Sequence, residues 1–429
     1  MSIAEYIEVS IFRKNGFWTT LIMGPLLLGY LLLYPNLILH ATEFSKTYIK
    51  YPLMASLFLI TFVLGVRAIV NYWFFMIVLA LLVFNYIYVQ THPLSQFPMQ
   101  AVLFLLLAGM YYRHPNFIGL YFKASIFVSI IFSLQTIIVF FCWLGEVLGL
   151  GTAIHVQSWI FQGESQARVI NLFLGSNGWV NVAWWAGFRA SSYFSEAARF
   201  AYFLTPFLYV TAYLRGRSLY YSAAFYLISL SIILTFSVAA FASIAITYFL
   251  WRYGTLSKKI KFLFLLVCIL IPIFFISYVA NQELWDTIFY KGQSAHTRIL
   301  AFNILMKMIG MHLTGCDMIN PLCVKVIAKV TWAPLFWLLF SGVQGFCFML
   351  LMLLYFGYVL LYLINTGGEF ERALGYGGVA VLLEQTWWGN YLEFPFIGYF
   401  AILIAVVAIR RKLKKKYGVT GKNGEFGNE

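Results

Sequence analysis

Charged side chains are scarce in this chain: 10% of its residues are Asp, Glu, Lys or Arg, whereas 62% are hydrophobic. The mean hydropathy is +0.83. This balance excludes an ordinary soluble domain, in which roughly 25% of residues are charged. Apolar runs recur along the chain, many of them near the roughly 20 residues that a helix needs to cross the hydrocarbon core. The composition therefore predicts an all-α polytopic membrane protein that forms a single integral membrane domain over residues 1–429.

Several chemical signatures are also missing from the sequence. It contains no Gly-rich phosphate loop, paired-His metal site or Ser/His/Asp nucleophile set, and its five cysteines follow no metal-ligand spacing. We therefore expect no bound metal and no cofactor. Cys142, Cys268 and Cys347 lie in apolar runs and are interpreted as packing residues. Cys316 and Cys323 share one polar segment, and they would form a disulfide only if that segment faces an oxidising compartment.

Acidic residues are outnumbered, with 15 Asp and Glu against 29 Lys and Arg, for a net charge of +14. Cytoplasmic loops of membrane proteins collect Lys and Arg, so this excess does not indicate a nucleic-acid partner. No small-residue cleavage site follows the first apolar run, which predicts an uncleaved first span and not a removable signal peptide.

The apolar runs predict about twelve spans, near 17–39, 51–67, 71–90, 97–112, 124–150, 199–215, 219–235, 236–252, 261–280, 336–364, 374–388 and 393–409. An even number of spans places both termini on one side, and the basic tail 410–429 identifies that side as the cytoplasm. Most other Lys and Arg in short gaps then fall in the cytoplasm, with Lys46 and Lys50 as exceptions. Two long loops, 151–198 and 281–334, face outward.

The first long loop carries the basic residues Arg168 and Arg189, with Arg199 at its exit. The positive-inside rule does not account for basic residues in an outward-facing loop. Ser195 is a predicted N-cap and Glu196 falls in the first turn of the helix that follows. A helix N-terminus attracts anions, and the planar fork of Arg189 beside it would hold two phosphate oxygens. Glu196 is either a catalytic carboxylate or simply an acidic residue that favours a first helical turn.

The second long loop contains another candidate cation, Arg298. If 294–311 is an amphipathic helix, His296 and Lys307 fall on its polar stripe and Arg298 falls on its apolar side. A cation on an apolar face needs an anionic partner, such as a carboxylate or a bound phosphate. His296 and His312 are candidate bases, although such histidines are more often ordinary surface residues.

Two features of the apolar runs lead to further predictions. The segment Thr235-Phe236-Ser237 is expected to turn between two spans. Glu384 and Glu393 lie in or near the last two spans, where a carboxylate is a functional candidate or faces a polar cavity.

From about residue 185 to 409 the chain resembles the bacterial O-antigen polymerase and ligase superfamily. Three segments carry the resemblance. The run from Arg189 to Ala201, RASSYFSEAARFA, is similar to the family's run of Arg, aromatic and acidic or His residues entering a span. Leu234-Thr-Phe-Ser237 looks like its Thr-x-Ser. Ser294-Ala-His-Thr-Arg298, followed by Gly315, resembles the Arg and Gly pattern of its second outer loop.

The resemblance implies a GT-C-like helical bundle in the bacterial inner membrane, with an active site formed by the two outer loops and no need for a metal. The substrates would be undecaprenyl-pyrophosphate-linked oligosaccharides. Arg189 and Arg298 would hold the pyrophosphates, assisted by Arg199, Lys307, Arg168 and His312, and Glu196 or His296 would act as the base. A chain-length regulator and a flippase of the same pathway would be partners.

One departure from the family pattern separates its branches. Ligases carry a His-Asn pair late in the second loop, where this chain has Lys329-Val-Thr-Trp332 and no His. This favours a polymerase over a ligase. The non-enzymatic alternative is a lipid-linked oligosaccharide flippase or another secondary transporter. Against this alternative, the sequence has no internal repeat and no matching pair of broken spans, which are typical of such transporters.

Overall fold

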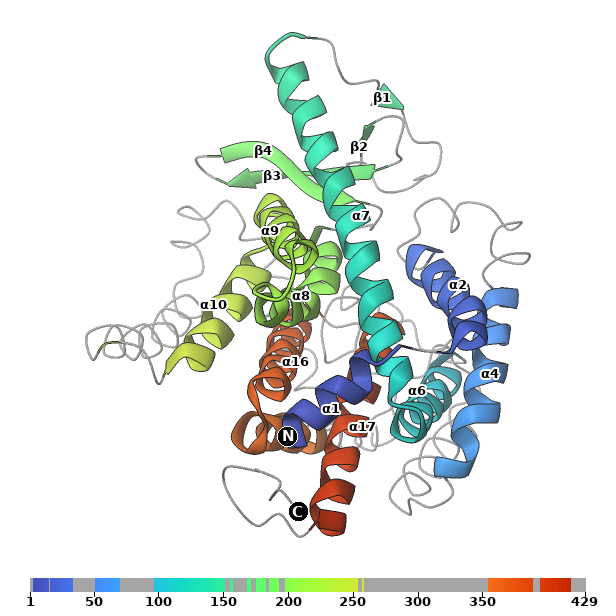
Figure 1. Cartoon of the computed structure of the whole chain (residues 1–429). Coiled ribbons are helices and arrows are strands. Elements are labelled where there is room, and N and C mark those ends of the chain that lie inside the picture. Colours follow the sequence, from blue (N-terminus) through green and yellow to red (C-terminus); the bar gives the residue numbers. More distant parts are fainter. Residues whose placement is uncertain are drawn as a thin grey trace, which may run out of the picture.

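The computed structural model describes the segments 3–14, 16–33, 51–69, 96–150, 155–156, 168–170, 175–182, 185–192, 197–253, 257, 354–388 and 394–417. Within these segments the protein is a bundle of helices with one small sheet at an end (Figure 1). The labelled helices are α1 Ile3–Phe12, α2 Phe17–Leu33, α4 Tyr51–Ile69, α6 Gln96–Arg113, α7 Asn116–Val147, α8 Ala197–Leu214, α9 Leu219–Leu234, α10 Val238–Arg252, α16 Glu369–Trp388 and α17 Phe394–Tyr417. A further apolar helix occupies Leu354–Thr366.

The prediction of a helical bundle is confirmed, and most predicted spans coincide with helices. The helices α8, α9 and α10 match the predicted spans 199–215, 219–235 and 236–252. The breaks between these helices, at 215–218 and 235–237, fall where the predicted spans meet. Ser218 caps α9 by accepting a hydrogen bond from the Tyr221 backbone N–H at 3.4 Å. The predicted spans 71–90 and 261–280 lie outside the described residues, as does the first part of 336–364.

Large aromatic rings fill the centre of the bundle. Tyr121, Phe122, Phe207 and Tyr399 are fully buried, and their ring centroids lie 5.9–6.4 Å apart in successive contacts. Such edge and tilted contacts are favourable for aromatic pairs. Helices also approach closely where one residue has no side chain: a Cβ on Gly65 of α4 would clash with the Leu106 carbonyl oxygen of α6. The core therefore depends on aromatic volume and on small residues at helix crossings.

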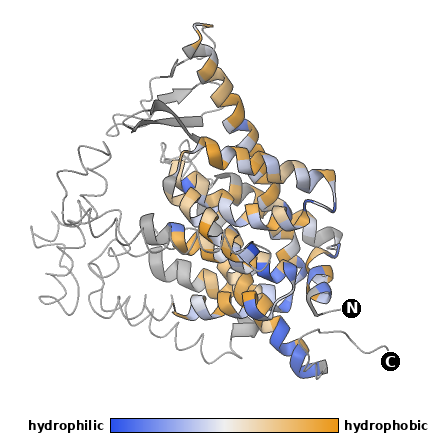
Figure 2. Cartoon of the chain, turned by 90° about the vertical axis from the view of Figure 1, so that its left-hand side faces the viewer, coloured by the Kyte–Doolittle hydropathy of each residue, from blue (hydrophilic) through white to orange (hydrophobic). Residues whose placement is uncertain are grey.

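The outer faces of the helices are apolar as well (Figure 2). Phe141 of α7 is 62% exposed, Tyr226 of α9 65% and Val63 of α4 64%. Among the described residues one stretch, Asn116–Cys142, is both long and apolar enough to cross a membrane, and five helical stretches are apolar but shorter. Hydrophilic residues gather along the last turns of α17, where the chain carries its basic tail.

The first long loop contains a four-stranded antiparallel sheet that was not predicted from the sequence. Its strands are β1 His155–Val156, β2 Arg168–Ile170, β3 Gly175–Val182 and β4 Trp185–Ser192, in that order across the sheet. The alternation Val180-Asn181-Val182 and the flanking Trp residues are typical of strands, and only two residues separate β3 from β4, as in a tight hairpin. The helical bundle thus carries a sheet at one end.

Candidate functional site at the sheet end of the bundle

The sheet rests on the end of the bundle from which α8 starts. The last strand, β4, contacts α7, α8 and α9 (Figure 1). The turn between α9 and α10 lies at this same end, because α8, α9 and α10 follow one another through short connections. Three of the segments singled out in the sequence therefore meet here: the Arg189 strand, the start of α8 and the 235–237 turn.

The sheet places the backbones of two predicted phosphate ligands near each other. Arg189 in β4 pairs with Gly178 of β3, and Arg168 in β2 pairs with Asn177 of the same central strand. Strands lie about 4.8 Å apart, so the two arginine backbones are separated by about 10 Å. Because Asn177 and Gly178 are successive residues of β3, Arg168 and Arg189 belong to one small sheet but lie on its opposite faces.

Ser192 fixes the end of β4 to the middle of α7. It is buried, and its φ of 50° is unusual for a residue other than glycine. The Ser192 hydroxyl donates to the Gln135 side-chain oxygen and lies 3.5 Å from the Phe132 carbonyl oxygen, both on α7. Since Ser192 follows Arg189 by three residues, this bond holds the Arg189 strand in register with the bundle.

Replacing Gln135 with leucine should loosen β4. The buried Ser192 hydroxyl would lose its shorter hydrogen bond and keep only the 3.5 Å contact with the Phe132 carbonyl oxygen, which costs about 1–3 kcal/mol. Amide hydrogen exchange over residues 185–192 should rise by about five- to a hundredfold as the strand opens more often. The matched control is Ser129→Ala, which removes a 2.7 Å bond inside α7 to the Ser125 carbonyl oxygen and involves neither Ser192 nor its acceptors. Unchanged exchange in Gln135→Leu would contradict this anchoring role.

The helix α8 begins at Ala197, so Arg199 lies in its first turn. Arg199 is half-buried there. Ser195 and Glu196 come just before the helix but lie outside the described residues, so their roles as cap and as base or first-turn acid remain predictions. The positive end of the α8 dipole nevertheless points to the sheet, as an anion site between β4 and α8 requires.

The predicted turn at Thr235-Phe236-Ser237 is confirmed. Phe236 has a φ of 46°, and the buried Thr235 hydroxyl donates to the Ile232 carbonyl oxygen at 2.7 Å while accepting from the Ser237 N–H at 3.3 Å. Ser237 then caps α10 through the Ala240 N–H at 3.5 Å. The Thr-x-Ser hydroxyls are thus occupied in making the turn, which is a structural role.

Glu384 of α16 is 3% exposed and contacts α8. The Thr205 hydroxyl donates to the Glu384 carboxylate at 2.7 Å. Thr205 is eight residues into α8, which places this bond about 12 Å from the start of the helix. A second polar contact follows at about one turn further, where the Tyr209 hydroxyl meets the Thr247 hydroxyl of α10. Glu384 is therefore a buried carboxylate with a hydroxyl partner; Glu393 lies outside the described residues.

Four predicted site residues belong to the second long loop: Arg298, His296, Lys307 and His312. All lie outside the described residues, together with Cys316 and Cys323. Their roles therefore stay predictions.

Two polar contacts were missed in the sequence. Between Phe117 and Val147 of α7, Gln135 is the only amide side chain, a signal that could have marked it. Glu371 and Arg410 form a buried ion pair between α16 and α17, at the end of the bundle away from the sheet. Among the described residues no group of three or more His, Cys, Asp or Glu is placed to hold a metal ion.

In comparisons with known proteins, no protein-family model and no curated protein matches the sequence.

Proposed function

We propose that this protein is a polymerase of lipid-linked oligosaccharide repeat units, such as those of O-antigen or a related surface polysaccharide, in the bacterial inner membrane. It would act on the outer face, at the sheet end of the bundle. The growing glycan on undecaprenyl pyrophosphate is the donor, and a new repeat unit on the same kind of carrier is the acceptor. The family resemblance of residues 185–409 is the origin of the proposal.

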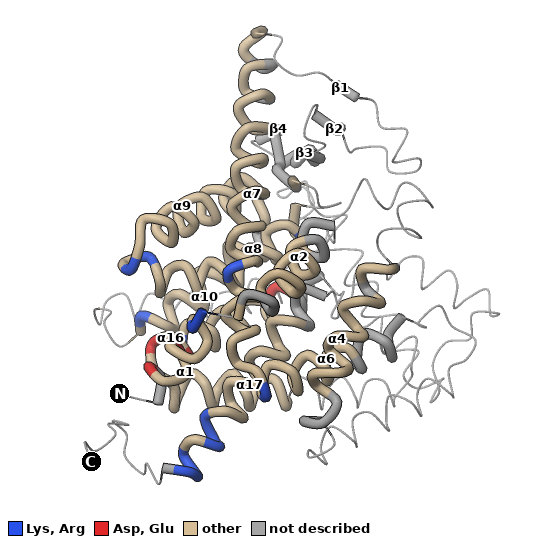
Figure 3. Tube along the Cα trace, turned by 45° about the vertical axis from the view of Figure 1, so that its right-hand side comes forward, with Lys and Arg blue, Asp and Glu red and all other residues tan. Residues whose placement is uncertain are grey.

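Membrane insertion through about twelve spans, with both termini in the cytoplasm, is supported by two features of the described helices. Their outer faces carry large exposed apolar residues. Their Lys and Arg lie mostly in the half of the bundle away from the sheet, and most densely along the end of α17 (Figure 3). A basic side opposite an outward-facing sheet is the arrangement expected from the positive-inside rule.

Cysteine labelling tests this orientation with a matched pair of substitutions. Leu150, at the sheet end, is 69% exposed, and Leu219, at the other end, is 86% exposed. In a variant without the native cysteines, a membrane-impermeant maleimide added to spheroplasts should label Leu150→Cys and not Leu219→Cys. Both should react after permeabilisation. Labelling of Leu219→Cys from outside would contradict the proposed sidedness.

The observation that carries the proposal is the anchoring of the Arg189 strand across the end of the bundle. β4 contacts three helices, and Ser192 ties it to Gln135 of α7. The backbone of Arg189 is held in this way, and preorganised charge is what stabilises a leaving anion. Arg199 in the first turn of α8 adds a second cation at the same end.

The reaction follows from that charge. A sugar hydroxyl of the acceptor attacks the anomeric carbon of the donor, a new C–O bond forms, and the bond to the pyrophosphate oxygen breaks. Undecaprenyl pyrophosphate leaves with its charge balanced by Arg189, Arg298 and Arg199. The hydroxyl proton passes to a base, for which Glu196 and His296 are the candidates. The energy comes from the glycosyl–pyrophosphate bond, so no nucleotide sugar or metal enters.

A transporter of lipid-linked oligosaccharide is the second candidate, and one observation favours it. Glu384 is a buried carboxylate inside a helix predicted to span the membrane, as ion- or substrate-coupled transporters require. Its bond to Thr205 also fits a purely structural contact between α8 and α16. The two functions therefore predict opposite sensitivities: Arg189 matters most to a polymerase and Glu384 to a transporter.

Reconstituted vesicles distinguish the two candidates. Lipid-linked repeat units are supplied in the leaflet that faces the sheet end, and both glycan length and transfer to the other leaflet are followed. We expect chain growth without transfer, lost in Arg189→Ala and kept in Glu384→Gln, since Gln retains an acceptor for Thr205. Transfer without growth, abolished in Glu384→Gln, would establish the transporter instead.

A further inference from the structure

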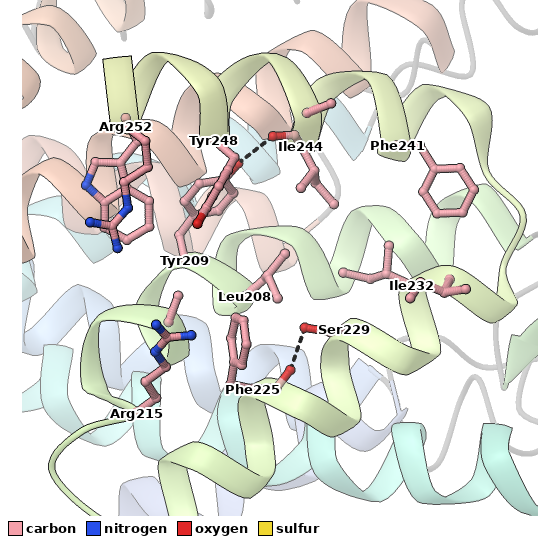
Figure 4. A pocket seen from close by; sticks show the side chains of 14 residues that line it. Leu208, Tyr209, Arg215, Phe225, Ser229, Ile232, Phe241, Ile244, Tyr248 and Arg252 are labelled. Carbon is pink, nitrogen blue, oxygen red and sulfur yellow. Dashed lines mark hydrogen bonds between the residues drawn. The ribbon is translucent and has the colours of Figure 1, made fainter. Parts of the chain in front are cut away.

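A groove of about 370 Å³ opens between α8, α9 and α10 on the side of the bundle (Figure 4). Its volume falls within the roughly 300–1,000 Å³ typical of ligand pockets. The walls are mostly apolar: Phe225 and Ile232 come from α9, and Phe241, Ile244 and Tyr248 come from α10. Phe241 and Tyr248 are 37% and 52% exposed, so the groove is open to the surroundings of the bundle along its length.

Two hydroxyls in the groove wall, those of Tyr209 and Ser229, already have partners within the protein. The Tyr209 hydroxyl contacts Thr247 and lies 3.3 Å from the Ile244 carbonyl oxygen. The Ser229 hydroxyl donates to the Phe225 carbonyl oxygen at 2.7 Å. Burying an unpaired polar group is unfavourable, and an apolar chain that enters the groove would leave neither of these hydroxyls unpaired.

Two arginines stand at one end of the groove. Figure 4 shows Arg215 of the α8–α9 connection and Arg252 of α10 on the same side, with Ile232 and Phe241 at the far end. Arg215 lies over the Phe225 ring at 5.4 Å, and Arg252 over the Trp251 ring at 5.2 Å. The residues lining the groove include these two cations and neither Asp nor Glu, so its charge is complementary to an anion.

The length of the groove matches one leaflet of a bilayer. From Phe241 to Arg252 the helix α10 rises through eleven residues, or about 16 Å. Half of the hydrocarbon core is about 15 Å. An acyl chain lying along the groove would thus reach the middle of the membrane when its headgroup is level with the arginines.

We infer that the groove binds an anionic phospholipid of the cytoplasmic leaflet, with its phosphate between Arg215 and Arg252 and one acyl chain along α10. This inference depends on the membrane orientation of the chain and not on glycan polymerisation. The isoprenoid tail of the proposed substrate does not fit this site, because its pyrophosphate would lie on the outer side, near Phe241, where the described groove residues carry no cation.

Lipid titration of the delipidated protein in detergent, followed by native mass spectrometry, tests the site. Phosphatidylglycerol and phosphatidylcholine with identical acyl chains serve as probes. A basic residue near an anionic headgroup contributes about fivefold in affinity, so Arg215→Gln/Arg252→Gln should bind phosphatidylglycerol about 25-fold more weakly. Binding of phosphatidylcholine should fall much less, because its choline already neutralises the phosphate. The control Arg113→Gln/Lys123→Gln removes two exposed cations of another part of the bundle and should bind like wild type.

A second variant tests the apolar part of the groove with both arginines in place. Ala245 lines the groove and is exposed, so Ala245→Trp fills the space without disturbing buried packing. It should lower phosphatidylglycerol binding while leaving the thermal midpoint of unfolding unchanged. Equal binding by wild type and the double glutamine variant would overturn the inference, as would an equal loss in the Arg113/Lys123 control.

Discussion

Replacing Arg189 with alanine should lower the rate of glycan polymerisation by about 10²- to 10³-fold, the usual effect of removing one preorganised charge-stabilising group. Arg189 lies in β4 within three residues of the Ser192 anchor, so its backbone is held at the end of the bundle. Arg189→Lys should keep part of the rate, because lysine keeps the charge but cannot hold two phosphate oxygens in a planar fork. The initial rate of chain growth with purified substrates measures both effects.

The matched control for Arg189→Ala is Arg113→Ala, at the other end of the bundle. Arg113 is exposed in the last turn of α6, and its removal should leave the rate within about twofold of wild type, as expected for a surface cation. A polymerisation rate in Arg189→Ala similar to that of the control would show that Arg189 has no role in the active site.

Arg410→Met should strongly destabilise the protein. Glu371 is 0% exposed and Arg410 is 9% exposed; the Arg410 guanidinium bonds the Glu371 carboxylate and the Thr366 carbonyl oxygen. Glu371 also accepts from the Gly368 N–H at 2.5 Å at the start of α16. Removing the cation leaves a buried, unpaired carboxylate, which lowers the free energy of unfolding by about 3–5 kcal/mol.

The neighbouring Arg411 supplies the control for this prediction. It is exposed and stacks on Tyr358 at 5.5 Å and Tyr362 at 5.3 Å, so Arg411→Met should lower the free energy of unfolding by no more than about 1 kcal/mol. The double variant Glu371→Gln/Arg410→Met should recover at least half of the loss, because no charge is then left buried. Unfolding in detergent measures all three. A similar decrease in the free energy of unfolding for Arg410→Met and Arg411→Met would show that the buried ion pair contributes no more to stability than a surface contact.

Helix positions were predictable because apolar runs and Pro, Ser and Gly breaks are local signals. The helix α1, Ile3–Phe12, lies in none of the predicted spans, and the other errors lie at the ends of helices. The fifth span was predicted from residue 124, but α7 begins at Asn116, directly after Pro115, and continues through the exposed Lys123. A proline starts a helix more decisively than a single charge interrupts one. In the same way α17 runs on to Tyr417 through the basic tail, since Arg and Lys are good helix formers.

The candidate site was predictable only in part. Arg168, Arg189 and the 235–237 turn could be identified from residue type and spacing, and the structure places them at one end of the bundle. The sheet that holds the two arginines was not predicted, because strands of two to eight residues within a polar loop give a weak periodic signal. Partners such as Ser192 and Gln135 are 57 residues apart, and only the fold brings them together.

The decisive experiment is polymerisation of purified lipid-linked repeat units by the purified protein in detergent, with wild type beside Arg298→Ala. We expect a ladder of lengthening glycans from wild type and none from Arg298→Ala, although both proteins are folded. No ladder from folded wild type, supplied with its own repeat unit, would contradict the polymerase and make transport the leading function.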